Sequence, residues 1–109
     1  MSVLSDENRY QLLKLLEENP EMSQRQIAAA LGVSLGKVNF CLRALIEIGS
    51  VKVANFSLSP NKKAYVYLLT PKGIEEKAKV TLRFLAKKQN EYEELKREIN
   101  ELKNEVKLL

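Results

Sequence analysis

Hydrophobic residues recur at helical spacing in three short segments of the first half of the chain. The first segment, residues 6–18, is expected to be a helix because leucines line one face and Ser5 before it is a favourable N-cap. Ser23 and Gln26 have the spacing of a capping box, which predicts a second helix over residues 24–31.

A third helix is expected almost immediately afterwards, since Gly32 ends the second one and Ser34 is the next N-cap candidate. Gly49 is expected to close this third helix. Its apolar stripe comprises Val38, Leu42, Leu45 and Ile46. The pattern therefore predicts two short helices joined by a tight turn.

The period of the pattern changes after Gly49. Val51 and Val53 alternate with Lys52, and residues 65–69 form a second β-rich run. The intervening residues, 57–63, are rich in turn formers and carry two lysines. These features predict a β-hairpin with a long, basic tip.

One long helix is expected from Thr70-Pro71 to the last residue, because the only glycine is Gly73 near its start and no further proline follows. Its residues fit a heptad repeat in which nine of eleven core positions are apolar or aromatic. Position a holds Ala78, Leu85, Tyr92, Ile99 and Val106, and position d holds Ile74, Thr81, Lys88, Leu95, Leu102 and Leu109. We therefore expect a coiled coil.

The flanking charges favour a parallel, two-stranded coil. Glu91 and Glu98 lie at g, Lys96 and Lys103 lie at e, and these positions face one another across a parallel dimer. The dimer residues are expected to be Leu85, Tyr92, Leu95, Ile99, Leu102, Val106 and Leu109. A single helix folded back on its own domain is the alternative.

The first half of this long helix carries a wider apolar surface, with Leu82, Phe84 and Leu85, which predicts packing on the preceding domain as well as on a partner. Lys88 at a core position indicates a weak point in the seam. The expected domains are residues 1–72 and residues 73–109.

Taken together, the pattern predicts a mainly α fold with a small β-hairpin: a winged helix-turn-helix followed by a long C-terminal coiled-coil helix. In that fold the second helix of the pair enters the major groove of DNA, and arginine, lysine and asparagine read base edges there. The residues expected to read bases are Leu35, Gly36, Lys37, Asn39, Phe40 and Arg43. An amphipathic helix with a merely solvated outer face is the alternative.

Contacts to phosphate are expected from the start of the second helix, the cap of the third and the hairpin tip. The residues are Gln24, Arg25, Ser34, Asn61, Lys62 and Lys63. The net charge of +4 is unevenly distributed, because residues 49–72 contain four lysines and no acid. A local basic excess of this kind is typical of nucleic-acid binders, although many lysine-rich loops are only solvated.

Other classes of function find little support in the composition. The chain has no histidine and no combination of nucleophile and base, metal cluster or phosphate loop, so we expect neither an enzyme nor a metal or cofactor. Cys41 is the only cysteine and is expected to be a small core residue, with a redox sensor as the alternative. Neither a signal peptide nor a membrane span is recognised, so a cytoplasmic protein is expected.

Residues 23–56, SQRQIAAALGVSLGKVNFCLRALIEIGSVKVANF, resemble the winged helix-turn-helix of MarR-type regulators. Residues 65–73, YVYLLTPKG, resemble the second wing strand and the start of the next helix in that family. The runs SLGKVNFCLRALIEIG and TPKGIEEKA are similar to a short MarR-like group associated with exopolysaccharide gene clusters in bacteria. The resemblance covers about residues 8–105.

The resemblance implies a homodimeric, double-stranded-DNA-binding regulator of transcription, with residues 34–48 as recognition helix and residues 51–69 as wing. Larger MarR proteins have extra helices that build a dimer interface and a ligand pocket. No such N-terminal extension is evident here, so dimerisation is expected from the C-terminal helix and no small-molecule effector is identified. A winged-helix module that binds a protein instead of DNA is the second hypothesis.

Overall fold

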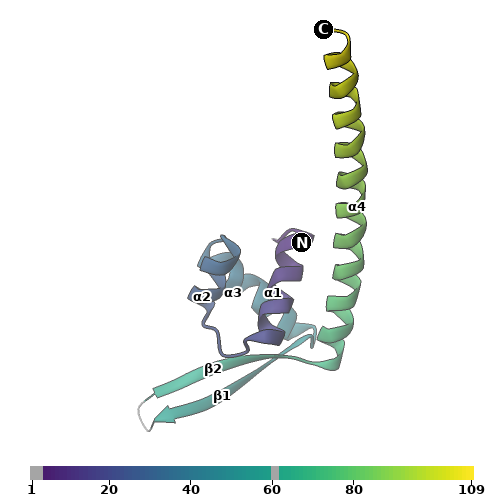
Figure 1. The fold of residues 1–109 in the computed structure, drawn as a ribbon. Coiled ribbons are helices and arrows are strands. Elements are labelled where there is room, and N and C mark those ends of the chain that lie inside the picture. Colours follow the sequence, from purple (N-terminus) through teal and green to yellow (C-terminus); the bar gives the residue numbers. More distant parts are fainter. Residues whose placement is uncertain (1–3, 60–61) are drawn as a thin grey trace.

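The computed structural model describes residues 4–59 and 62–109, and describes hairpin side chains only up to residue 54 and from residue 65 onward. The element order is α1 (Asp6–Glu18), α2 (Gln24–Leu31), α3 (Leu35–Glu47), β1 (Val51–Ser59), β2 (Lys62–Leu69) and α4 (Pro71–Lys107). The predicted fold class is confirmed: three short helices, an antiparallel hairpin and one long C-terminal helix (Figure 1).

Hydroxyl side chains cap the start of every helix, as the sequence predicts at the first three. Ser5, Ser34 and Thr70 each accept a hydrogen bond from the backbone N–H three residues later. Ser23 and Gln26 form the complete capping box at the start of α2. These caps satisfy N–H groups that a helix leaves without an internal partner, so the helix starts are determined locally.

The hairpin pairs β1 with β2 in antiparallel register, from Val51 opposite Leu69 to Ser59 opposite Lys62, with an irregularity between Ser57 and Ser59. The backbone N–H of Tyr67 also donates to the carbonyl of Pro20, at 3.1 Å, in the loop between α1 and α2. This bond attaches the base of the hairpin to the helical part of the domain.

One hydrophobic core joins the helices to the hairpin and to the first half of α4. Leu12, Leu13 and Leu16 of α1 are buried at its centre. The other elements contribute Ile27, Ala28, Leu31, Val38, Leu42, Leu45, Val51, Tyr67 and Val80. Cys41 is half-buried and packs against this core, which agrees with the expectation of a small core residue.

A compact junction connects the end of α3 to the start of α4. Thr70 donates its hydroxyl hydrogen to the carbonyl of Gly49, which lies in the left-handed region at φ +81°. Lys72 Nζ donates to the carbonyl oxygen of Ile48 at 2.6 Å, and the N–H of Thr70 donates to Ser50 at 3.1 Å. The carbonyl groups that end α3 are therefore satisfied by the residues that begin α4.

The closest approach in this junction is between Gly73 and the carbonyl oxygen of Ser50. A Cβ added to Gly73 would lie well inside the van der Waals distance of the Ser50 carbonyl oxygen. Any side chain larger than hydrogen would have to push the first turn of α4 away from the start of β1. We call the contacts of residues 70–73 with residues 48–50 the α3–α4 junction.

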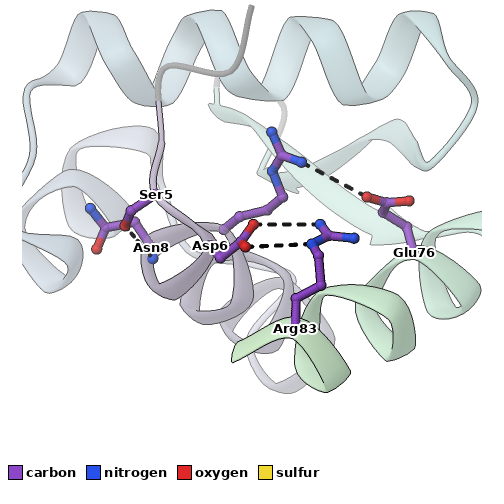
Figure 2. Close-up of polar contacts among 6 residues, drawn as sticks. Ser5, Asp6, Asn8, Glu76 and Arg83 are labelled. Atoms are coloured by element: carbon purple, nitrogen blue, oxygen red, sulfur yellow. Dashed lines mark hydrogen bonds and ion pairs between the residues drawn. The ribbon is translucent and has the colours of Figure 1, made fainter. Parts of the chain in front are cut away.

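Helix α1 lies alongside the first half of α4 (Figure 1). Arg83 reaches Asp6 with both Nε and a terminal nitrogen, each at 3.4 Å (Figure 2). The rings of Tyr10 and Phe84 stack with centroids 5.4 Å apart. Phe84 thus packs on the domain as predicted, whereas Leu82 and Leu85 stay exposed.

The second half of α4 extends beyond the rest of the chain, and the molecule measures 73 Å along its longest axis (Figure 1). The expected domain boundary between residues 72 and 73 falls in the first turn of this helix. Among residues 4–59 and 62–109, no single helix is long and apolar enough to cross a membrane; α2 and α3 pass such a test only together, bent by 112°.

The α3–α4 junction leads to a first prediction. Gly73→Ala should lower the free energy of unfolding by about 1–3 kcal/mol, because the new methyl group meets backbone and not a flexible side chain. Gly36→Ala is the matched control, since nothing lies within 4 Å of a Cβ at Gly36 and alanine favours the helix. Denaturant titration of both variants checks this, and equal stability would contradict the close contact.

Candidate nucleic-acid interface

Helix α3 has one buried face and one solvent face. Val38, Leu42 and Leu45 are buried, as predicted, and Ile46 is half-buried. All six residues expected to read bases are exposed, and we call this set the reading face: Leu35, Gly36, Lys37, Asn39, Phe40 and Arg43. The reading face is available to a ligand because all six residues are exposed.

A shallow groove of about 410 Å³ runs along the centre of this face, lined by Gly36, Asn39, Phe40, Arg43, Ala44 and Glu47. Phe40 is 55% exposed, which is unusual for a phenylalanine that only covers its own domain. Gly36 has open space in front of it, so another molecule can come close to the backbone there. The groove therefore combines an apolar ring, an amide and a cation, the three types of group that contact bases.

Two helices and the hairpin meet beside the reading face in a row of hydrogen bonds. Gln24, the first residue of α2, donates from Nε2 to the hydroxyl of Tyr67 at 3.0 Å. Its Oε1 accepts from Nδ2 of Asn39 at 3.2 Å. We call Tyr67, Gln24 and Asn39 the amide row. The predicted base reader Asn39 and the predicted phosphate residue Gln24 are thus brought together.

The remaining phosphate candidates lie on several different elements. Arg25 is exposed in the first turn of α2, and Ser34 caps α3 by accepting from Lys37 N at 3.2 Å. Lys62 and Lys63 begin β2 at the far end of the hairpin. Asn61 lies outside the described residues, so its expected role stays a prediction.

The a/d stripe of α4 is exposed along the part of the helix that extends beyond the domain. Tyr92, Leu95, Ile99, Leu102 and Val106 are each between 42% and 66% exposed, and Leu109 is fully exposed. Leu85 is exposed as well, whereas the face of α4 turned to its own domain carries Val80 and Phe84. The alternative of a helix folded back on its own domain therefore applies only to the first half.

Lys88 interrupts the apolar a/d stripe, and its side chain points toward Glu91 and Phe84. Its Nζ lies 3.3 Å from Oε2 of Glu91 and 5.3 Å from the centroid of the Phe84 ring. Both partners lie at heptad position g, next to the seam. The charge is thus directed away from the d position that Lys88 nominally occupies.

Sequence reasoning did not foresee the roles of Tyr67 and Lys72. Tyr67 is only 7% exposed, and a buried tyrosine generally needs a hydrogen-bond partner for its hydroxyl, which was the available signal. Lys72 contacts the end of α3 from a position 24 residues later in the chain, and nothing local marks it as a capping residue.

Comparison with known proteins agrees with this geometry. Residues 5–52 match a family model described as winged helix-turn-helix DNA-binding. No curated protein sequence matches the chain. The match covers α1, α2 and α3, and therefore includes the whole reading face.

Several solved structures share the fold. The transcriptional regulator homologue from Pyrococcus horikoshii OT3 is 21% identical with a TM-score of 0.57, over 75% of this chain and 80% of that one. Streptococcus pneumoniae FabT, solved in complex with DNA, is 18% identical with a TM-score of 0.57, over 75% and 56%. A MarR-family regulator from Rhodococcus sp. RHA1 is 25% identical with a TM-score of 0.56, over 72% and 54%.

The chain spans most of the Pyrococcus protein but only a little over half of FabT and of the Rhodococcus regulator. The family match ends at the start of β1, whereas the likenesses to solved structures extend over about three quarters of the chain. The chain therefore has a winged helix-turn-helix fold, and its structural neighbours include MarR-family regulators.

Proposed function

We propose that this protein is a homodimeric, sequence-specific regulator of transcription that binds double-stranded DNA in the cytoplasm. The observation that carries the proposal is the reading face, six exposed residues of α3 that include an amide, an aromatic ring and two cations, which are groups that contact bases. The opposite side of the same helix is buried in the core, so α3 has a defined orientation. FabT, a protein of similar fold, was solved bound to DNA.

Each residue of the reading face has a chemical role in this proposal. Arg43 and Lys37 suit the acceptors of guanine, and Asn39 suits adenine. Phe40 suits a thymine methyl group, and Gly36 permits close approach of the helix to the bases. Arg25, Ser34 and the hairpin-tip residues 61–63 then hold the phosphates, with Gln24 at the start of α2.

The a/d stripe supports a second copy of this chain as the dimer partner. An isolated helix that exposes a row of Leu, Ile and Val at heptad spacing loses the free energy of burying them, about 1.5–3 kcal/mol for each side chain. The charges at e and g favour a parallel pair, in which Glu91 and Glu98 face lysines of the other helix. A parallel pair places both DNA-binding domains at the same end of the coil.

The resemblance to a short MarR-like group extends the proposal to the regulated genes, which would be those of an exopolysaccharide cluster. A protein-binding winged-helix module is the competing function. It predicts no dependence of DNA binding on the reading face, and the following measurements separate the two.

Binding of a labelled duplex is expected to weaken steeply as salt rises, because lysine and arginine contacts to phosphate release counterions. Arg43→Ala should lower the affinity for a preferred duplex by about 1–3 kcal/mol. Lys87→Ala removes the same charge from an exposed site on α4, remote from the reading face, and should leave the affinity unchanged. Fluorescence anisotropy measures both, and equal affinities would favour the protein-binding module.

Dimerisation is tested by one substitution in the a/d stripe. Ile99→Asp should raise the Kd of the dimer by at least about a hundredfold, because each partner would bury an unpaired carboxylate. Asn104→Asp adds the same charge at heptad position f, on the opposite side of α4, and should leave the dimer intact. Sedimentation equilibrium of the full chain reports both, and a dimer that survives Ile99→Asp would overturn the coiled coil.

A further inference from the structure

The amide row connects the most buried tyrosine of the wing to an exposed residue of the reading face. Tyr67 on β2 is 7% exposed, Gln24 at the start of α2 is half-buried, and Asn39 on α3 is exposed. The two hydrogen bonds measure 3.0 Å and 3.2 Å. Two consecutive helices and the strand β2, which follows later in the chain, therefore meet in one row of polar side chains that runs from the core to the surface.

The buried end of this row is held on two sides. The Tyr67 side chain is part of the hydrophobic core, and its backbone N–H donates to Pro20 at 3.1 Å. Gln24 lies in the first turn of α2, where the capping box of Ser23 and Gln26 determines the helix start. The hydroxyl of Tyr67 is consequently a well-positioned acceptor for Gln24.

The direction of the hydrogen bonds decides what Asn39 presents to a ligand. Gln24 donates to Tyr67 through its amide nitrogen, and its oxygen is turned to Asn39, which donates one N–H to it. The other N–H and the Oδ1 acceptor of Asn39 remain for a ligand. Adenine offers the complement in the major groove, an N7 acceptor beside an N6 donor.

We propose that Tyr67 is a positioning residue that acts through Gln24 to orient the amide of Asn39 for adenine. The inference rests on the proposed DNA-binding function and deepens it, since it assigns one base pair of the target to one residue. An asparagine without this support has to be ordered when DNA binds. The amide row already orders the Asn39 side chain in the free protein. It also connects the hairpin to α3 through hydrogen bonds.

The test removes a single oxygen atom. Tyr67→Phe in the full chain should weaken binding to a preferred duplex, selected from a random library, by about two- to tenfold, the cost of ordering one side chain. The lost affinity should come from one A·T base pair. Replacing that pair by G·C should therefore lower the affinity of the variant less than it lowers the affinity of the wild type. Affinity for an unrelated duplex should not change.

Tyr65→Phe is the matched control. Tyr65 lies two residues earlier on the same strand, so its side chain is on the same face, but it is 59% exposed. Loss of its hydroxyl should alter neither affinity nor base preference. Asn39→Ala should abolish the preference at the same base pair, and adding Tyr67→Phe to it should cause no further loss there.

Gln24→Met provides a second variant if Tyr67→Phe fails to fold, because methionine keeps the side-chain length and removes both hydrogen bonds. Since Gln24 is also a proposed phosphate contact, only the change in base preference is compared for this variant. A loss confined to the same A·T pair supports the positioning role. A loss from Tyr67→Phe that is uniform over all sequences, or unchanged base preference in either variant, overturns it. Wild-type protein that binds no duplex in a salt-sensitive way would instead reject the proposed DNA-binding function itself.

Discussion

The close contact between Gly73 and Ser50 is the constraint on which the rest of the structure depends. It brings the first turn of α4 against the start of β1, and Thr70 and Lys72 then satisfy the carbonyl groups of Gly49 and Ile48. Because α3 ends at this point, α3, the hairpin and α4 all meet at this junction. The orientation of the reading face relative to α4 follows from this junction.

Helix α4 has two apolar faces with different uses. Val80 and Phe84 pack on the domain. The ion pair of Arg83 with Asp6 also joins α4 to α1 (Figure 2). The a/d stripe lies on another side and stays exposed beyond Lys88. A surface ion pair contributes little to stability, so the packing of Val80 and Phe84 carries most of the attachment. In the proposed dimer, α4 belongs both to the coiled coil and to the packed domain, so the position of the coil determines the position of each reading face.

Local signals in the sequence were sufficient for much of the fold. Ser5, Ser23 and Ser34 mark the helix starts within a few residues of chain, and the bounds of α1 and α2 agree with the prediction. The exposure of the reading face also followed from helical periodicity alone. The amide row could not be derived in this way, since Gln24 and Tyr67 are 43 residues apart and meet only when the hairpin packs on α2. Nor does periodicity decide which apolar face of α4 contacts α1.

The central claim is that two copies of this chain present two equivalent recognition helices to DNA. Selection of bound duplexes from a random-sequence library at near-physiological salt tests it most directly. A two-fold symmetric dimer should enrich an inverted repeat, with its half-sites separated by a fixed spacing. Enrichment of a single half-site or a direct repeat would contradict the symmetric dimer, and no enrichment at all would contradict sequence-specific recognition by α3.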